Sequence, residues 1–165
     1  MSGMKFREIK ENKKQFLSLL LLADEQENMI DRYLEKGTMY VLDDNGVKAE
    51  CVVTDEGDGI LEIKNIATVP EYQGNGYAKT LIDFIVKEYA DKYSVLQVGT
   101  GDSPLTVPFY EKCGFVRSHI IQQEPSQSRR LLPVLQTAHA ESRDKSIMRR
   151  ASSSSTTAYS FASPA

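Results

Sequence analysis

A glycine-rich turn near the middle of the chain is the segment whose residue types and spacing best support chemistry. Gln73, Gly76 and Ala78 follow the pattern Q-x-x-G-x-A within the run V-P-E-Y-Q-G-N-G-Y-A. The small residues let the backbone amides of residues 74–78 converge at the start of the helix that follows. Unpaired N–H groups and the helix dipole both attract negative charge at such a point. The spacing therefore predicts an anion site, and a pyrophosphate fits it.

The turn needs a strand before it and a helix after it. Residues 60–69 alternate as a packed strand does, and one face is formed by Leu61, Ile63, Asn65, Ala67 and Val69. Residues 78–89 carry an apolar stripe at helical spacing, formed by Ala78, Leu81, Ile82, Ile85, Val86 and Tyr89. Lys79 and Asp83 lie away from that stripe, so we expect this helix to cover a sheet with its apolar side.

The remaining elements complete an alternation of strands and helices. The expected strands are residues 5–9, 38–42, 47–54, 60–69 and 95–98, with extended chain again from residue 115. The expected helices end at about residue 23, at Gly37, at Tyr89 and at Cys113. Asn45-Gly46 lies between the second and third strands and suits a tight hairpin. This order predicts an α/β fold with a mixed sheet.

The composition favours one domain that takes a small ligand. A chain of 165 residues is long enough for one core. The net charge of -3, from 20 basic and 23 acidic residues, gives no electrostatic reason to expect nucleic acid or an anionic membrane as a partner. The apolar run at 16–23 is shorter than the roughly 20 residues of a membrane span and lacks the layout of a secretory signal. We expect it to be a buried helix.

The cysteines and histidines do not form a recognisable metal or redox motif. Cys51 and Cys113 have neither metal-ligand nor redox spacing. Two thiols in a chain of this size suggest a reducing compartment, so we expect a cytoplasmic protein. His119 and His139 are unclustered, and the sequence indicates no metal site.

The composition changes at about residue 120. Residues 120–165 hold 10 of the 15 serines and none of the 10 glycines. We therefore expect a domain at 1–119 and an atypical Ser-rich segment at 120–165 that is largely disordered. The apolar run at 131–135 is the best candidate for a last strand, but Pro133 cannot donate to a ladder. The C-terminal strands are expected to be atypical or missing.

Three motifs together resemble a known family. The strand I-A-T-V-P, the turn Q-G-N-G-Y-A and the later run S-P-L-T-V-P-F-Y-E-K-C-G-F are similar to the GNAT superfamily of acetyl-CoA dependent N-acetyltransferases, over residues 4–119. Small bacterial members of unassigned substrate share the runs L-L-L-L-A-D and G-T-G-D-S. The resemblance implies a central, mostly antiparallel sheet with a splayed parallel pair, and acetyl-CoA as cosubstrate.

The resemblance also implies roles for the matching positions. The backbone amides that would hold the coenzyme pyrophosphate are those of Gly74, Asn75, Gly76, Tyr77 and Ala78. Gln73 would brace the turn, and Ser103 stands where relatives carry an asparagine that contacts the pantetheine arm. The backbone expected to pair with this arm is that of Ala67, Thr68 and Val69. An N–H near Ala67 would polarise the acetyl carbonyl.

The acid and the base are predicted less sharply. Tyr110 matches the tyrosine that protonates the departing thiolate in the family, although a tyrosine beside Phe109 also suits simple packing. Glu62 matches the catalytic glutamate of relatives that acetylate protein lysines, but a strand glutamate is also often paired with a lysine. Asn65 or a chain of waters could replace it. Cys113 has no base near it in sequence, which favours a buried thiol over a nucleophile.

The resemblance implies transfer of an acetyl group to a primary amine by direct attack, through a ternary complex. The acceptor class stays open between a small-molecule amine and a protein amine, and a homodimer also stays open. The alternative is a non-catalytic coenzyme A binding module whose acceptor site is lost through the altered C-terminus. A nucleotide site of another kind is disfavoured, because G-N-G-Y-A matches neither G-x-G-x-x-G nor the P-loop pattern.

Overall fold

The computed structural model describes residues 3–101, 106–121 and 145–151. Its strands are β1 (Lys5–Ile9), β2 (Thr38–Asp43), β3 (Val47–Asp55), β4 (Ile60–Thr68), β5 (Val95–Gly101), β6 (Val116–Ile121) and β7 (Lys145–Ala151). Its α-helices are α1 (Leu17–Ala23), α2 (Glu27–Leu34), α3 (Tyr77–Tyr89) and α4 (Thr106–Lys112). Short 3-10 helices lie at Lys13–Phe16 and Pro70–Tyr72.

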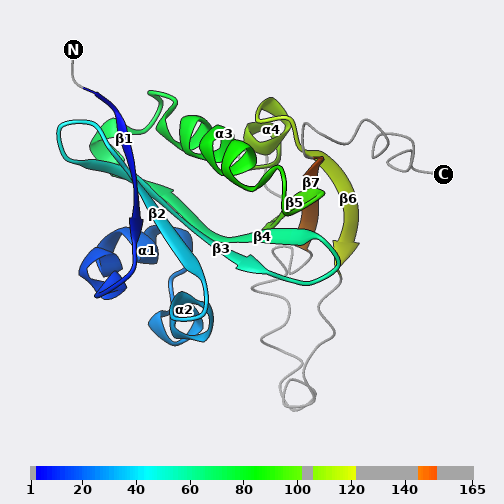
Figure 1. The fold of residues 1–165 in the computed structure, drawn as a ribbon, viewed down its shortest axis with the longest axis horizontal. Coiled ribbons are helices and arrows are strands. Elements are labelled where there is room, and N and C mark those ends of the chain that lie inside the picture. Colours follow the sequence, from blue (N-terminus) through cyan, green and yellow to red (C-terminus); the bar gives the residue numbers. More distant parts are fainter. Residues whose placement is uncertain (1–2, 102–105, 122–144, 152–165) are drawn as a thin grey trace, which may run out of the picture.

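The described strands form one seven-stranded sheet in the order β1-β2-β3-β4-β5-β7-β6 (Figure 1). Neighbouring strands are antiparallel, except that β4 and β5 are parallel. The predicted mixed α/β class, with a mostly antiparallel sheet and one parallel pair, is therefore confirmed. None of the helices in the described ranges has the length and apolar character that a bilayer span needs.

The parallel pair separates part-way along its length. β4 and β5 pair only from Ile60–Val95 to Ile63–Val98, although β4 continues to Thr68 and β5 to Gly101. Beyond Ile63, the side of β4 that faces β5 is not paired with that strand. Backbone groups in the middle of a sheet must find partners elsewhere, so this gap is a natural place for a ligand.

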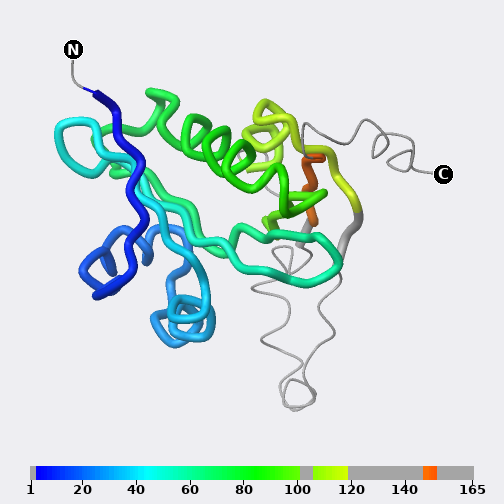
Figure 2. The backbone as a smooth tube through the Cα atoms, viewed as in Figure 1, coloured from blue at the N-terminus to red at the C-terminus, as the bar shows by residue number. Residues whose placement is uncertain are grey.

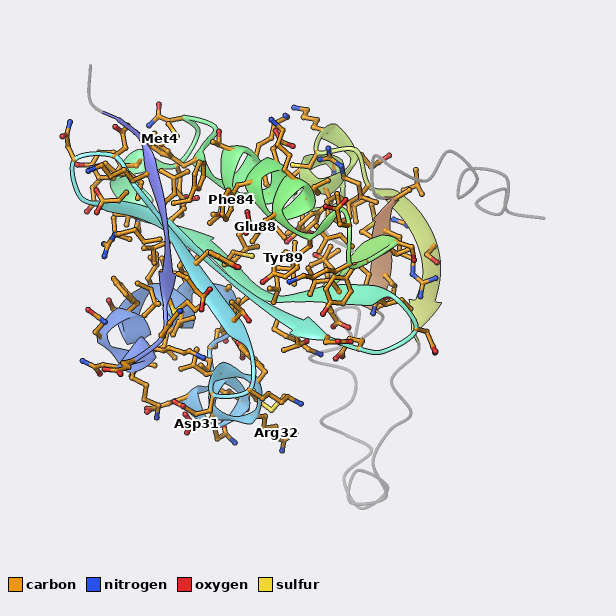
Figure 3. The ribbon with its side chains drawn as sticks, viewed as in Figure 1. Met4, Asp31, Arg32, Phe84, Glu88 and Tyr89 are labelled. Carbon is orange, nitrogen blue, oxygen red and sulfur yellow. The ribbon has the colours of Figure 1, made fainter. Side chains whose placement is uncertain are left out.

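Helices cover both faces of the sheet (Figures 1 and 2). α3 lies on one face, and α1 and α2 lie on the other. Figure 3 shows Phe84 and Tyr89 of α3 on the side of the helix that faces the sheet. Phe84 stacks on Phe6 of β1 with ring centroids 4.3 Å apart, and Tyr89 meets Tyr40 of β2 edge to face. The apolar stripe predicted for this helix therefore does pack on the sheet.

A bulge in β4 changes which residues share a face. Val52 of β3 is opposite Asn65, while the next residue, Val53, is opposite Ile63, so Lys64 is an extra residue. Ile63 therefore packs in the α3-side core, whereas Asn65 donates a hydrogen bond to the α1 carbonyl of Leu20. The prediction of one unbroken alternation over residues 60–69 is wrong, because a bulge shifts the side-chain phase by one residue.

The sheet also includes residues beyond 119, where the sequence places the end of the domain. β7, orange in Figure 2, lies between β5 and β6 and buries Ile147 and Met148. The C-terminal strands were expected to be atypical or missing, and β7 is present, with only three apolar side chains among its seven residues. The run at 131–135 lies outside the described residues. The sequence did not predict β7, because apart from Ile147, Met148 and Ala151 its side chains are polar. Arg150 donates hydrogen bonds to Asp83 of α3 at 2.9 Å and to the Cys113 carbonyl at 2.7 Å.

Candidate functional site

A cavity of about 590 Å³ lies where β4 leaves β5, between the start of α3 and α4. We call it the splay cavity. The predicted site residues that line it are Ala67, Thr68, Gln73, Gly74, Gly76, Tyr77, Ala78 and Tyr110. Val69 and Asn75 lie beside these residues in the chain but not in the wall, and Ser103 lies outside the described residues. The volume is in the range of sites that hold a drug-sized ligand.

The glycine-rich turn has the backbone that the sequence predicts. Gly74 and Gly76 have φ of +85° and +82°, and a Cβ built on either would meet no atom within 4 Å. The Gln73 amide donates to the Thr68 carbonyl at 3.2 Å, and the Asn75 amide donates to the Tyr72 carbonyl at 3.0 Å. These two side-chain hydrogen bonds hold the turn in place. The two glycines have no side chain that would cover the backbone amides of the turn.

Gly76 is the N-cap of α3, and the first backbone bond of the helix runs from the Thr80 N–H to the Gly76 carbonyl at 3.0 Å. The N–H groups of the first helical turn, including those of Tyr77 and Ala78, have no acceptor within the helix. They lie at the positive end of the helix dipole. This end of the splay cavity is therefore suited to a phosphate.

Two lysines in the wall add positive charge that the sequence did not assign to the site. Lys79 and Lys112 line the splay cavity from α3 and α4. Lys79 also pairs with Asp83 at 2.9 Å, one turn further along α3. Its position outside the apolar stripe was the available signal in the sequence. No pattern in the sequence pointed to Lys112 as a site residue, because only the tertiary structure brings α4 beside the turn.

The backbone at the end of β4 is partly engaged. The Val69 N–H donates to the Lys48 carbonyl at 2.8 Å, and the Val69 carbonyl accepts from the Tyr72 N–H at 2.9 Å. Ala67 and Thr68 lie next to the open side of β4 and line the splay cavity. A ligand that pairs with this strand would therefore rely on Ala67 and Thr68 more than on Val69.

Tyr110 lines the splay cavity and is also packed. It is 7% exposed, and its ring meets Phe109 and Phe115 edge to face at centroid distances of 5.1 and 5.5 Å. Burial raises the pKa of the phenol above its ordinary value, and neighbouring Cys51 and Cys113 add to the effect. The phenol is therefore protonated at neutral pH. The packing role is therefore present, and the role of Tyr110 as a proton donor stays a prediction.

Glu62 lies away from the wall of the splay cavity. It pairs with Lys64 at 3.1 Å and accepts a hydrogen bond from the Gln97 amide at 2.7 Å. At the usual rise of a strand, Glu62 is about 13 Å from Ile66, which does line the cavity. The pairing with a lysine that the sequence allowed is therefore present, and the role of Glu62 as a base stays a prediction.

The two cysteines are buried free thiols. Cys113 lines the splay cavity, and burial raises its pKa above the ordinary value. A protonated thiol is a weak nucleophile, which agrees with the sequence argument against a covalent intermediate. Within the described ranges, no three His, Cys, Asp or Glu side chains cluster as metal ligands would.

Comparison with known proteins now decides the family. The family model described as an acetyltransferase (GNAT) domain matches residues 35–117. The chain belongs to the GNAT family of acetyltransferases. A GNAT relative, the uncharacterized N-acetyltransferase YvbK of Bacillus subtilis, is 32% identical over 108 residues, which cover 64% of this chain and 70% of the relative.

Solved acetyltransferase structures superpose on most of this chain. An IAA acetyltransferase from Bacillus cereus superposes with a TM-score of 0.73 at 29% identity, over 90% of this chain and 99% of that protein. A GNAT acetyltransferase from Elizabethkingia anophelis, solved with acetyl-CoA bound, gives a TM-score of 0.75 at 23% identity, over 92% of this chain and 99% of that protein. The second likeness shows the fold alone.

Proposed function

We propose that this GNAT protein binds acetyl-CoA in the splay cavity and transfers the acetyl group to a primary amine by direct attack, with both substrates bound together. The cavity itself carries the proposal, because it joins the glycine-rich turn, the open side of β4 and Tyr110. The Elizabethkingia anophelis acetyltransferase, which has the same fold, holds acetyl-CoA. Acetyl-CoA supplies an acyl group activated as a thioester.

The phosphate end of the cavity fits a pyrophosphate. The two glycines leave open space where a Cβ would stand, so a phosphate can approach the backbone closely. The N–H groups proposed to bind it belong to Gly74, Asn75, Gly76, Tyr77 and Ala78. Lys79 and Lys112 add two positive charges to the same wall. The hydrogen bond from Gln73 to Thr68 keeps this turn in place.

The other end of the cavity supplies the groups that acyl transfer needs. Ala67 and Thr68 present the open edge of β4, where an extended pantetheine arm can pair with the strand. An N–H near Ala67 can stabilise negative charge on the acyl oxygen. Tyr110 keeps its proton at neutral pH and lies in the wall, so it can protonate a departing thiolate.

Two measurements test the proposal together. The first is calorimetric titration of the protein with acetyl-CoA, and the second is thiol release from acetyl-CoA in the presence of butylamine, spermidine, lysine and a lysine-containing peptide. We expect binding, and release that depends on one class of amine. Binding with no release on any amine would favour a non-catalytic coenzyme A binding module. No binding would refute the proposal.

Gly76→Val is the most direct test of the proposed phosphate-binding site at the glycine-rich turn. We expect the Kd for acetyl-CoA to rise by roughly 100-fold or more, because the new side chain fills the open space and strains a left-handed residue. Gly57→Val is the matched control. Gly57 also has φ of +82° and open space at its Cβ, but it lies in the turn between β3 and β4, outside the cavity wall. Equal Kd values for acetyl-CoA in the two variants would contradict a phosphate-binding site at this turn.

A further inference from the structure

The glycine-rich turn lies on the surface of the protein. Residues 71–76 are all exposed, and Gly74 and Gly76 have left-handed backbones. Glycine loses more conformational freedom than any other residue when its backbone is fixed. A phosphate that binds the amides of this turn therefore bears the cost of ordering them, unless the free protein already holds the turn in place.

The hairpin between β2 and β3 contacts the residue that follows the turn (Figure 1). The Tyr77 hydroxyl donates a hydrogen bond to Asp44 Oδ2 at 2.7 Å, across 33 positions of the chain. Tyr77 is the first residue of α3 and lines the splay cavity, whereas Asp44 is outside the wall. The bond to Asp44, with burial and the charge of Asp44 adding to it, raises the pKa of the Tyr77 phenol. The phenol therefore keeps the proton that it donates.

The same hairpin contacts the residue that precedes the turn. Lys48, near the start of β3, is only 8% exposed, and its ammonium lies 3.8 Å from the centre of the Tyr72 ring. The ammonium also donates to the Asn45 carbonyl at 3.3 Å. The Tyr72 and Tyr77 rings meet edge to face, with centroids 6.4 Å apart. Residues 73–76 thus lie between two tyrosines, and the hairpin contacts both.

The hairpin is itself held by local hydrogen bonds. Asp43 Oδ1 accepts from the Gly46 N–H at 3.0 Å, and the Asp44 N–H donates to the Gly46 carbonyl at 2.9 Å. Arg7 of β1 pairs with the other carboxyl oxygen of Asp43 at 3.1 Å. The backbone that carries Asp44 is therefore ordered, so its carboxylate can fix the position of Tyr77.

A carboxylate beside an anion site has two opposed effects. Its charge repels a phosphate, and salt screens this repulsion at a protein surface. Its bond to Tyr77 orders the start of α3, which favours binding. The two effects predict opposite signs when the carboxylate is removed: the Kd for the phosphate ligand falls if repulsion dominates and rises if positioning dominates.

Resting on the proposed function, we propose that Asp44 is a positioning residue for coenzyme binding. Its bond to Tyr77 holds the start of α3, so that the backbone amides of residues 74–78 already point toward the pyrophosphate before acetyl-CoA arrives. Asp44 acts through Tyr77 and contacts neither the ligand nor the reacting atoms. Its contribution is therefore to the Kd for acetyl-CoA.

The other end of α3 offers a matched control. The Tyr93 hydroxyl donates to Asp55 Oδ2 at 3.0 Å, which joins the segment after α3 to the end of β3. Asp55 also accepts from the Gly57 N–H at 2.7 Å in the next hairpin. Neither Tyr93 nor Asp55 lines the splay cavity. This pair has the same chemistry as Tyr77 and Asp44 but does not contact the glycine-rich turn.

The test measures the Kd for acetyl-CoA by calorimetry in Asp44→Ala, Asp44→Asn, Tyr77→Phe and Asp55→Ala. We expect Asp44→Ala and Tyr77→Phe to raise the Kd by roughly 10-fold, since each removes the bond. Asp44→Asn should stay within about 2-fold of wild type, because its amide oxygen still accepts from the Tyr77 hydroxyl. Asp55→Ala should bind as wild type does. If Asp44→Ala does not fold, Tyr77→Phe, which removes only one hydroxyl, decides the test.

A second measurement needs no ligand. Hydrogen exchange of the free protein over residues 70–80 should be faster in Asp44→Ala than in Asp44→Asn or Asp55→Ala, because the turn loses its support. Wild-type Kd values in Asp44→Ala and Tyr77→Phe, tighter binding by Asp44→Ala, or an equal loss of affinity in Asp44→Asn or Asp55→Ala would each overturn the inference and leave the proposed function standing. Unchanged exchange in Asp44→Ala would do the same. Wild type that binds no acetyl-CoA overturns the proposed function, and this inference with it.

Discussion

The two faces of the sheet bury different kinds of side chain. The α3 face packs the apolar side of α3 against β2, β3, β4, β5 and β7, and the buried side chain of Tyr110 lies at the splay cavity. The α1/α2 face is smaller, and the polar side chains that it buries include Lys13, Glu50 and Asn65. Every unpaired buried side-chain oxygen among the described residues is on this second face.

The two faces therefore contribute differently to the stability of the fold. Apolar burial stabilises a protein without needing a specific partner, at about 25 cal/mol for each Å². A buried carboxyl has the opposite effect unless it is paired. The apolar α3 face therefore contributes most to the stability of the scaffold, whereas the α1/α2 face carries buried polar oxygens at a cost in stability.

Removing the hydroxyl of Tyr110 should have the largest effect. We expect Tyr110→Phe to lower kcat by roughly 100-fold, because a positioned proton donor is lost, with little change in the Kd for acetyl-CoA. Tyr40→Phe is the control, since Tyr40 is equally buried on the α3 face but outside the cavity wall, where its hydroxyl bonds Tyr89 at 2.8 Å. Equal kcat in wild type and Tyr110→Phe would leave Tyr110 with a packing role only.

A glycine pair tests whether the α1/α2 face is tightly packed despite its polar atoms. A Cβ on Gly37 would lie 2.8 Å from the Tyr33 carbonyl oxygen and 2.9 Å from Val52 Cγ1, so Gly37→Ala should cost about 1–3 kcal/mol of unfolding free energy. A Cβ on Gly99 of β5 would lie at an ordinary 3.6 Å from Ile147. Urea unfolding should therefore find Gly99→Ala close to wild type. Equal stability of both variants would mean that the α1/α2 layer is loose.

The smallest expected effect is on the melting temperature of a Glu50 variant. Burial raises the folded-state pKa of Glu50, so the folded protein keeps a proton that the unfolded chain releases above about pH 4.3. The stability linked to this proton is complete below that pH and is lost as the pH rises toward the folded-state pKa. Glu50→Gln cannot ionise, so we expect it to melt a few degrees above wild type at pH 7 and equally at pH 4. A variant that melts lower at pH 7 would show that Glu50 is a stabilising residue.

Much of the glycine-rich turn and of the helix after it could be predicted from the sequence. The spacing of Gln73, Gly76 and Ala78 was enough to predict the turn, because three residues within six positions fix its backbone conformation. The stripe on α3 and the position of Tyr110 in the cavity also followed the prediction. These features depend on local spacing, or on a motif carried by neighbouring residues.

The buried polar face and the last strand could not be predicted in the same way. Glu50 sits in the run A-E-C-V-V, where nothing local separates a buried carboxyl from a solvated one. The bulge at Lys64 reverses which residues face α1, and no turn residue marks it. β7 joins the sheet through pairing with β5 and β6 and through the contact between Arg150 and Asp83, although its own apolar content is low.

The sequence by itself determined the family, the glycine-rich turn and the amphipathic third helix, because each depends on residues close together in the chain. Only the tertiary structure decided that β4 opens away from β5, that Glu50 lies beside Ala67, and that Lys79 and Lys112 meet at one wall. These outcomes depend on strand register, and register is set by contacts across the whole sheet.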